Sequence, residues 1–93
     1  MRTTKLTKNF KRDYRREQAG EFAKKLDAVL SEITSLLAVD APLPPRCVDH
    51  ALVGRWKDHR DCHIRPDLVL IYRKPDAEAL ELVRLGSHSE LGL

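Results

Sequence analysis

The segment RDCHIRPDLVLIYR, residues 60–73, decides the fold class of this 93-residue chain. In its first part, Arg60–Arg65, apolar and polar residues alternate as they do on a strand that buries one face. The dipeptide Pro66-Asp67 is typical of a tight turn, and the run Leu68–Arg73 that follows is apolar on both faces. The segment therefore predicts two antiparallel strands, the second of which is central in a sheet.

Three more extended runs flank this pair. Residues 1–6 predict a short strand, Ala51–Lys57 a strand before the pair, and Ala79–Leu85 a strand after it. The sequence KPDAE at 74–78 supplies a turn between the last two strands. The sheet is therefore expected to have four or five strands and to be mostly antiparallel.

Two helices lie between the first run and the others. Thr7 is a suitable N-cap for a helix that ends near Gln18, with Phe10 and Tyr14 on one face and Gly20 as its C-cap. A second helix begins near Glu21. Its apolar face, at helical spacing, consists of Phe22, Leu26, Val29, Leu30, Ile33 and Leu37.

The proline-rich segment APLPP at 41–45 cannot continue a helix, so we expect it to cross to the sheet as an extended loop. A helical hairpin with one apolar face must bury that face against another element, and the predicted sheet is the element that can receive it. The sequence thus predicts a single α+β domain over residues 1–93, in which a two-helix hairpin packs on one face of a mostly antiparallel four- to five-stranded sheet.

Composition limits the class of protein. Hydrophobic residues make up 42% of the chain and aromatic residues 5%, which suits one thin, mainly aliphatic core. No apolar run approaches the roughly 18 residues of a membrane span, and no signal-peptide pattern opens the sequence. Only two cysteines occur, Cys47 and Cys62, and they form no CxxC motif, which argues against a disulfide framework or a thiolate zinc site. We therefore expect a cytoplasmic protein with no membrane partner.

The net charge of +3 is unevenly distributed. Residues 1–25 contain nine Lys or Arg and three Asp or Glu, a net charge of +6, whereas the remainder carries −3. A basic N-terminal third is typical of a surface that binds an anionic polymer, although a solvated helix face explains it equally well from composition alone.

Strand alternation also predicts a functional face. Asp61 and His63 point to the side opposite Cys62 and Ile64. If the latter two face the helices, Asp61 and His63 line the uncovered side of the sheet. Titratable groups on a rigid strand are then available for catalysis or anion binding.

Three motifs carry a family resemblance: PLP at 42–44, DHxLxGxWxxxRDxHxxPDxxLIY at 49–72, and RxGxH at 84–88. Together they resemble the YafQ branch of the RelE/ParE toxin superfamily. The resemblance implies a RelE-like fold and a bacterial type II toxin that cleaves messenger RNA on the ribosome without a cofactor or metal. It also implies a RelB- or DinJ-like antitoxin, and operator DNA binding only by the toxin–antitoxin complex.

The resemblance also implies the active-site residues. They are His50, Asp61, His63, Asp67 and His88, with His88 as the catalytic acid. Gly92 stands where the family has an aromatic residue, four positions after that histidine. The basic N-terminal third would then contact ribosomal RNA or the antitoxin.

These residue types suit RNA cleavage. The reaction needs a base for the 2′-OH, cations to offset charge on the phosphorus, and an acid for the leaving 5′-oxygen, and imidazole can act as acid or base near neutral pH. His50 or His63 is the expected base, and Asp61 or Asp67 is expected to orient an imidazole. The candidates for phosphate contact are Arg60, Arg65 and Arg84, of which Arg84 is favoured because it leads into the GSH segment.

Three alternatives remain open. His59, Asp61 and His63 alternate along one strand and are spaced to ligate zinc in a metal-dependent hydrolase. A ParE-type toxin binds gyrase without catalysis on the same fold, but that branch lacks this cluster of histidines and aspartates. A binding module with a decayed site is the third, and the presence of all five polar positions argues against it.

Overall fold

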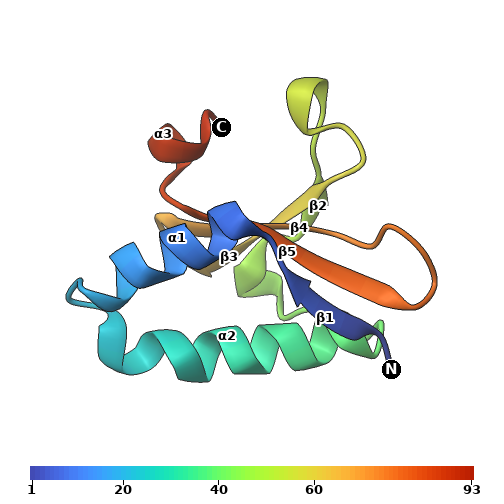
Figure 1. Cartoon of the computed structure of the whole chain (residues 1–93), viewed down its shortest axis with the longest axis horizontal. Helices are drawn as coiled ribbons and strands as arrows, with labels where there is room; N and C mark the ends of the chain where they lie inside the picture. The colour runs from blue at the N-terminus through green and yellow to red at the C-terminus, as the bar shows by residue number, and fades with distance from the viewer.

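Figure 1 shows the computed structural model of the chain, which describes residues 1–93. The sheet has five strands in the order β1-β5-β4-β3-β2. β1 pairs parallel with β5, and the other neighbours are antiparallel. This architecture confirms the predicted α+β class. The strands are β1 (Thr3–Leu6), β2 (His50–Ala51), β3 (Arg60–Arg65), β4 (Leu68–Arg73) and β5 (Ala79–Gly86).

The helices divide between the two sides of the sheet. Helices α1 (Lys8–Gln18) and α2 (Ala23–Ala38) cover one face, whereas the short α3 (His88–Leu91) and the loop after β2 lie on the other (Figure 1). Two single 3-10 turns, η1 (Pro45–Cys47) and η2 (Gly54–Trp56), complete the chain. No helix is both long enough and apolar enough to cross a membrane.

The ends of α1 test two predictions. Thr7 is the N-cap as predicted, because its hydroxyl oxygen accepts a hydrogen bond from the backbone N–H of Phe10 at 3.0 Å. The C-cap is Ala19 rather than Gly20, and it keeps right-handed helical geometry. Since this helix end needs no residue with positive φ, the conformational freedom of glycine is not used there.

The main core lies between the sheet and the hairpin. Leu26, Leu30 and Ile33 of α2 are buried against strand side chains, which confirms the predicted apolar face. Burial of aliphatic side chains supplies most of the stability of such a layer, at about 25 cal/mol per Å² of apolar surface. The strand contributors are Cys62, Ile64, Leu68, Leu70, Tyr72, Leu80, Leu82 and Leu85.

Strand β4 is buried on both sides, as the run LVLIY predicted. On the side away from the hairpin, Val69 and Ile71 form a second, smaller cluster with Leu91 of α3. Trp56 packs against this cluster, and its indole N–H donates to the carbonyl of Leu91 at 3.3 Å. The small cluster therefore fixes the C-terminal helix on the sheet.

The predicted strand Ala51–Lys57 is wrong. Only His50–Ala51 pairs with β3, and the chain then leaves the sheet through η2. Gly54 adopts φ 68° there, a left-handed conformation that breaks an extended run. Leu52 and Trp56 instead pack over the small cluster, so their apolar character serves a loop and not a strand.

Candidate active site

Strand pairing places the first two predicted site residues side by side. His50 on β2 is directly opposite Asp61 on β3. Cys62 and Ile64 belong to the core under the hairpin, which places Asp61 on the other face of the sheet as expected from alternation. The predicted assignment of faces on β3 is therefore confirmed.

Two oxygen atoms lie close to the ring of His50. Its Nδ1 lies 2.9 Å from the carbonyl oxygen of Val48 and 2.9 Å from Oδ1 of Asp61. A carbonyl can only accept, so Nδ1 carries a proton, and in the neutral ring Nε2 is the atom with the free lone pair. The side chain is 52% exposed, which leaves Nε2 accessible to a substrate. A neutral His50 is thus oriented as a base.

Asp61 is buried, with 2% of its surface exposed. Its Oδ1 is close to His50 but not aligned with an N–H, so this oxygen has no hydrogen-bond donor. Burial raises the pKa of the Asp61 carboxyl, and the neighbouring His50, His63 and His88 act in the opposite direction. The Asp61 carboxyl therefore lies within electrostatic range of three histidines.

His88 is fixed by Asp67, which comes from the turn between β3 and β4. Oδ1 of Asp67 lies 2.9 Å from Nδ1 of His88 and also accepts the backbone N–H of His88 at 3.3 Å. These hydrogen bonds lower the pKa of Asp67. The residue before the helix, Ser87, forms a capping box with Glu90 that anchors the first turn. His88 is thus the first residue of a helix that is held by the hydrogen bonds from Asp67 and by the Ser87–Glu90 capping box.

His63 lies next to His88. Their ring centroids are 5.0 Å apart, and the rings meet edge to face. A hollow of about 570 Å³ beside His63 is lined also by Arg46, Ile64, Arg65 and Pro66. Sequence reasoning did not select Arg46, because it follows the proline-rich segment and lies outside the motifs. The hollow places two arginines beside His63.

The three candidate arginines have different surroundings. Arg60 contacts Asp49, which also accepts the hydroxyl of Tyr72, so its guanidinium lies on the hairpin side of the sheet. Arg65 stacks on the ring of Phe22 at 4.7 Å. Neither contact involves a histidine.

Arg84 is on the catalytic side, in the same cross-strand row as Asp61. Ile71 pairs with Asp61 on one side and with Arg84 on the other, and directly paired residues share a face. Its Nε donates to Asp13 of α1 at 2.6 Å. Asp13 is a second residue that sequence reasoning missed, because a single aspartate in a basic helix gives no signal.

The three residues of the alternative zinc site, His59, Asp61 and His63, do not come together. His59 lies outside β3, its Nδ1 is 3.1 Å from the carbonyl of Lys57, and its ring contacts Trp56 edge to face. No group of three or more His, Cys, Asp or Glu side chains has the arrangement of a metal site. His59 is therefore part of the loop after β2 and not of the histidine cluster.

Comparison with known proteins matches this arrangement to a family. The profile of a family described as "Bacterial toxin of type II toxin-antitoxin system, YafQ" matches residues 2–92. The chain belongs to the YafQ family. The resemblance inferred from the three sequence motifs is thereby confirmed.

Curated YafQ relatives support this assignment over part of their length. A protein of Haemophilus influenzae named putative toxin YafQ is 51% identical over 55 residues, which cover 56% of this chain and 54% of the relative. An Escherichia coli protein named mRNA interferase toxin YafQ is 42% identical over 59 residues, 63% of each chain. The alignments thus span between about half and two thirds of these relatives.

Solved YafQ-like structures match the whole chain. A copper-bound mutant toxin from Helicobacter pylori has a TM-score of 0.89 and 45% identity, covering 98% of this chain and 99% of that one. The toxin in the E. coli DinJ–YafQ toxin–antitoxin complex has a TM-score of 0.81 and 32% identity, with 97% and 96% covered. The same fold therefore extends over nearly the whole chain.

Proposed function

We propose that this chain is a ribosome-dependent endoribonuclease that cleaves messenger RNA in the ribosomal A site and so inhibits translation. The observation that carries the proposal is the Asp67–His88 pair, which holds a histidine with Nε2 directed away from its carboxylate partner, beside His63 and Asp61. The relatives named mRNA interferase support it.

The reaction is general acid–base catalysis. Neutral His50 removes the proton from the 2′-OH through Nε2, and the 2′-oxygen attacks the adjacent phosphorus. The bond to the 5′-oxygen breaks, and protonated His88 gives its Nε2 proton to that oxygen. The products are a 2′,3′-cyclic phosphate and a 5′-OH, so no cofactor enters the balance.

The geometry favours His50 over His63 as base. The Nδ1 proton of His50 is held by the Val48 carbonyl, with the Asp61 carboxyl beside it, whereas the His63 ring contacts the ring of His88. In this assignment Asp61 stabilises the imidazolium that forms on His50, Asp67 orients His88, and His63 supports the His88 ring.

A protein antitoxin is the expected partner. One solved relative is the E. coli DinJ–YafQ complex. We infer that a DinJ-like antitoxin neutralises this chain and that only the toxin–antitoxin complex binds operator DNA. Ribosomal RNA is the expected target of the basic N-terminal third, at an affinity that falls with salt.

The test is to map new 5′ ends in messenger RNA after brief induction of the wild type, His88→Ala and, as a matched control, His59→Ala. We expect cuts at a fixed codon position in translated frames for the wild type and the control, and none for His88→Ala. A substrate with 2′-O-methyl at the scissile nucleotide should resist cleavage in vitro. Growth arrest without cuts, or cleavage of the methylated substrate, contradicts the proposal.

A further inference from the structure

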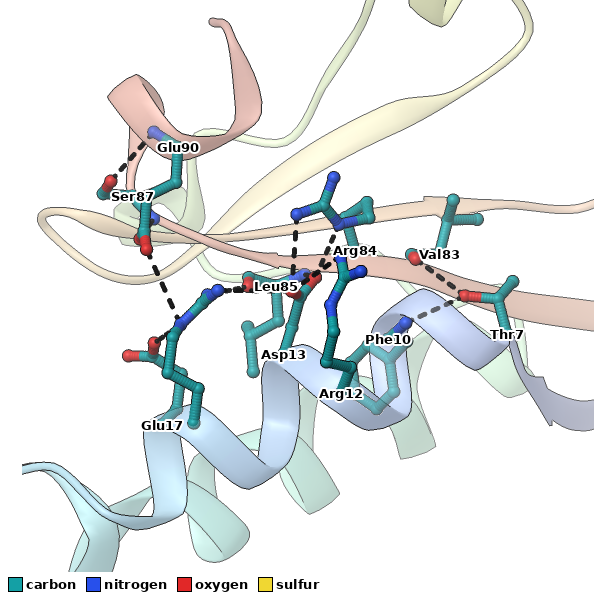
Figure 2. A network of polar contacts seen from close by, with 11 residues as sticks. Thr7, Phe10, Arg12, Asp13, Glu17, Val83, Arg84, Leu85, Ser87 and Glu90 are labelled. Carbon is teal, nitrogen blue, oxygen red and sulfur yellow. Dashed lines mark hydrogen bonds and ion pairs between the residues drawn. The ribbon is translucent and has the colours of Figure 1, made fainter.

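Helix α1 completes a strand edge that β1 leaves open. β1 pairs with residues 79–82 of β5, so the last part of β5 has no strand on that side. Side chains of α1 and of its N-cap residue form the hydrogen bonds to this edge instead. Thr7 donates to the carbonyl of Val83 at 2.7 Å, Asp13 accepts the N–H of Leu85 at 3.0 Å, and Arg16 donates to the Leu85 carbonyl at 2.9 Å (Figure 2).

Asp13 does more than this edge requires. Its carboxylate is fully buried and accepts from Nε of Arg84 at 2.6 Å and from Nη2 of Arg84 at 3.3 Å. A single neutral oxygen would satisfy the N–H of Leu85, whereas a buried charge is costly unless it is paired. Arg16 also donates to Oδ1 of Asp13, at 3.3 Å, but only Arg84 binds both carboxylate oxygens, and its 2.6 Å contact is the shortest.

The fork leaves one nitrogen of Arg84 for another partner. Nε and Nη2 are bound to Asp13, and Nη1 has no hydrogen bond within the chain. Figure 2 shows one nitrogen of the guanidinium turned away from Asp13 and α1. The side chain is 16% exposed, so it has little freedom to take another orientation. A planar guanidinium held at two points presents its third donor in a fixed direction.

That donor lies on the catalytic side of the sheet. Arg84, Ile71, Asp61 and His50 form one cross-strand row, and Gly86 pairs with Val69 in the next row, which also holds His63. Because neighbouring strands are about 4.8 Å apart, Arg84 and Asp61 are separated by about two strand spacings. An RNA phosphate spanning the histidines would be within reach of such a cation.

We propose that Asp13 is a positioning residue for cleavage: from helix α1 it fixes the guanidinium of Arg84 so that Nη1 is presented to the phosphate of RNA bound at the histidines. This inference rests on the proposed ribonuclease function. Asp13 itself touches no substrate. The competing explanation is that the ion pair only fastens α1 to β5.

A double-mutant cycle separates the two explanations. Arg84→Ala should lower kcat for ribosome-dependent cleavage by about 100- to 1000-fold, because an electrostatic donor is lost. Asp13→Asn keeps an acceptor for Leu85 but loses the charge, and should lower kcat by about 10- to 100-fold with little change in KM. If Asp13 acts through Arg84, the double variant cleaves no more slowly than Arg84→Ala alone. The proposal would be overturned if Asp13→Asn cleaved at the wild-type rate. It would also be overturned if the fold-losses in kcat of the two single variants multiplied in the double variant.

Glu81→Gln is the matched control. Glu81 lies on the same strand and pairs with Arg73, but at the end of β5 that is paired with β1. Loss of the Glu81 charge should leave cleavage unchanged. An inactive wild type would overturn the proposed function and this inference together, whereas an active wild type with an equally active Asp13→Asn overturns this inference alone.

A second variant covers the case in which Asp13→Asn does not fold. Arg84→Lys keeps the positive charge opposite the buried carboxylate, so the core contact remains paired. Lysine is a point donor and cannot bind two oxygens in a plane while presenting a separate N–H in a fixed direction. We expect its kcat to fall about 10-fold or more. Wild-type cleavage by Arg84→Lys would show that no fixed fork is needed.

Discussion

One carboxylate oxygen, Oδ1 of Asp67, binds both the ring and the backbone of His88, at 2.9 Å from Nδ1 and 3.3 Å from the N–H. The hydrogen bonds from His88 lower the pKa of Asp67, so this carboxyl is ionised at neutral pH and can only accept. The proton between them therefore sits on Nδ1. Nε2 is the atom left to carry a proton to the substrate.

Removing the carboxylate should impair the acid without unfolding the chain. Asp67 is largely exposed, so Asp67→Asn is expected to change the melting temperature little. The amide is an uncharged and weaker acceptor for the Nδ1 proton, so His88 is held less firmly and kcat should fall, though less than the roughly 100- to 10,000-fold expected for His88→Ala. Single-turnover cleavage on programmed ribosomes measures the rate of each of the two variants. Equal activity of Asp67→Asn and wild type would remove Asp67 from the mechanism.

At neutral pH, Asp61 should lower the free energy of unfolding while it supports cleavage. Burial raises its pKa, so the native state binds this proton more tightly than the unfolded state does. Its contribution is therefore most favourable at low pH and is lost as the pH rises from about 3.9 through the folded pKa. Asp61→Asn should then raise the free energy of unfolding at pH 7 by about 1 kcal/mol while cleavage falls.

Thermal melts between pH 4 and pH 8 check this sign. The gain in melting temperature of Asp61→Asn, about 4–8 °C for 1 kcal/mol in a domain of this size, should shrink as the pH falls toward 4. A lower melting temperature than wild type at pH 7 would mean that the contact with His50 outweighs the cost of burial.

Val48 is strained beside the proposed base. It is β-branched, it adopts φ 46°, and its carbonyl accepts the proton on Nδ1 of His50. Left-handed geometry costs such a residue about 1–2 kcal/mol, whereas asparagine tolerates it. Since the side chain is 54% exposed, Val48→Asn should raise the free energy of unfolding by about 1 kcal/mol and leave the carbonyl in place.

Val39→Asn is the control for this substitution. Val39 is 56% exposed but has φ −103°, so the same change relieves no strain there. Denaturation in urea compares the two variants. A gain at Val39 equal to that at Val48 would assign the effect to the polar side chain and not to the backbone.

Gly86 should be intolerant of a side chain. A Cβ there would lie 3.1 Å from Nη2 of Arg16 and 3.3 Å from Oε1 of Glu90, between α1 and the helix that carries His88. Gly86→Ala must displace one of them, which we expect to cost about 1–3 kcal/mol and at least about 10-fold in cleavage. At Gly20 the nearest atom is 3.4 Å away, so Gly20→Ala should resemble wild type in both melting temperature and activity.

Features that depend on local sequence pattern could be predicted before the structure was known. Alternation at Arg60–Arg65 and the doubly apolar run at Leu68–Arg73 predicted β3 and β4, because side-chain direction in a strand follows position along the chain. Thr7 predicted the start of α1 in the same way. The spacing of the histidine and aspartate motifs was enough to identify the family.

Features that depend on neighbours distant in sequence could be seen only in the folded chain. The apolar residues of Ala51–Lys57 looked like a strand, yet they pack on Leu91 after the chain leaves the sheet. Asp13 gave no signal, because its partners Arg84 and Leu85 lie in the last strand, far along the chain. The sequence pattern around a residue indicates which face of a helix or strand its side chain is on. The partner of that side chain is set only when the layers pack together, and the partner determines the charge and hydrogen bonding of the site.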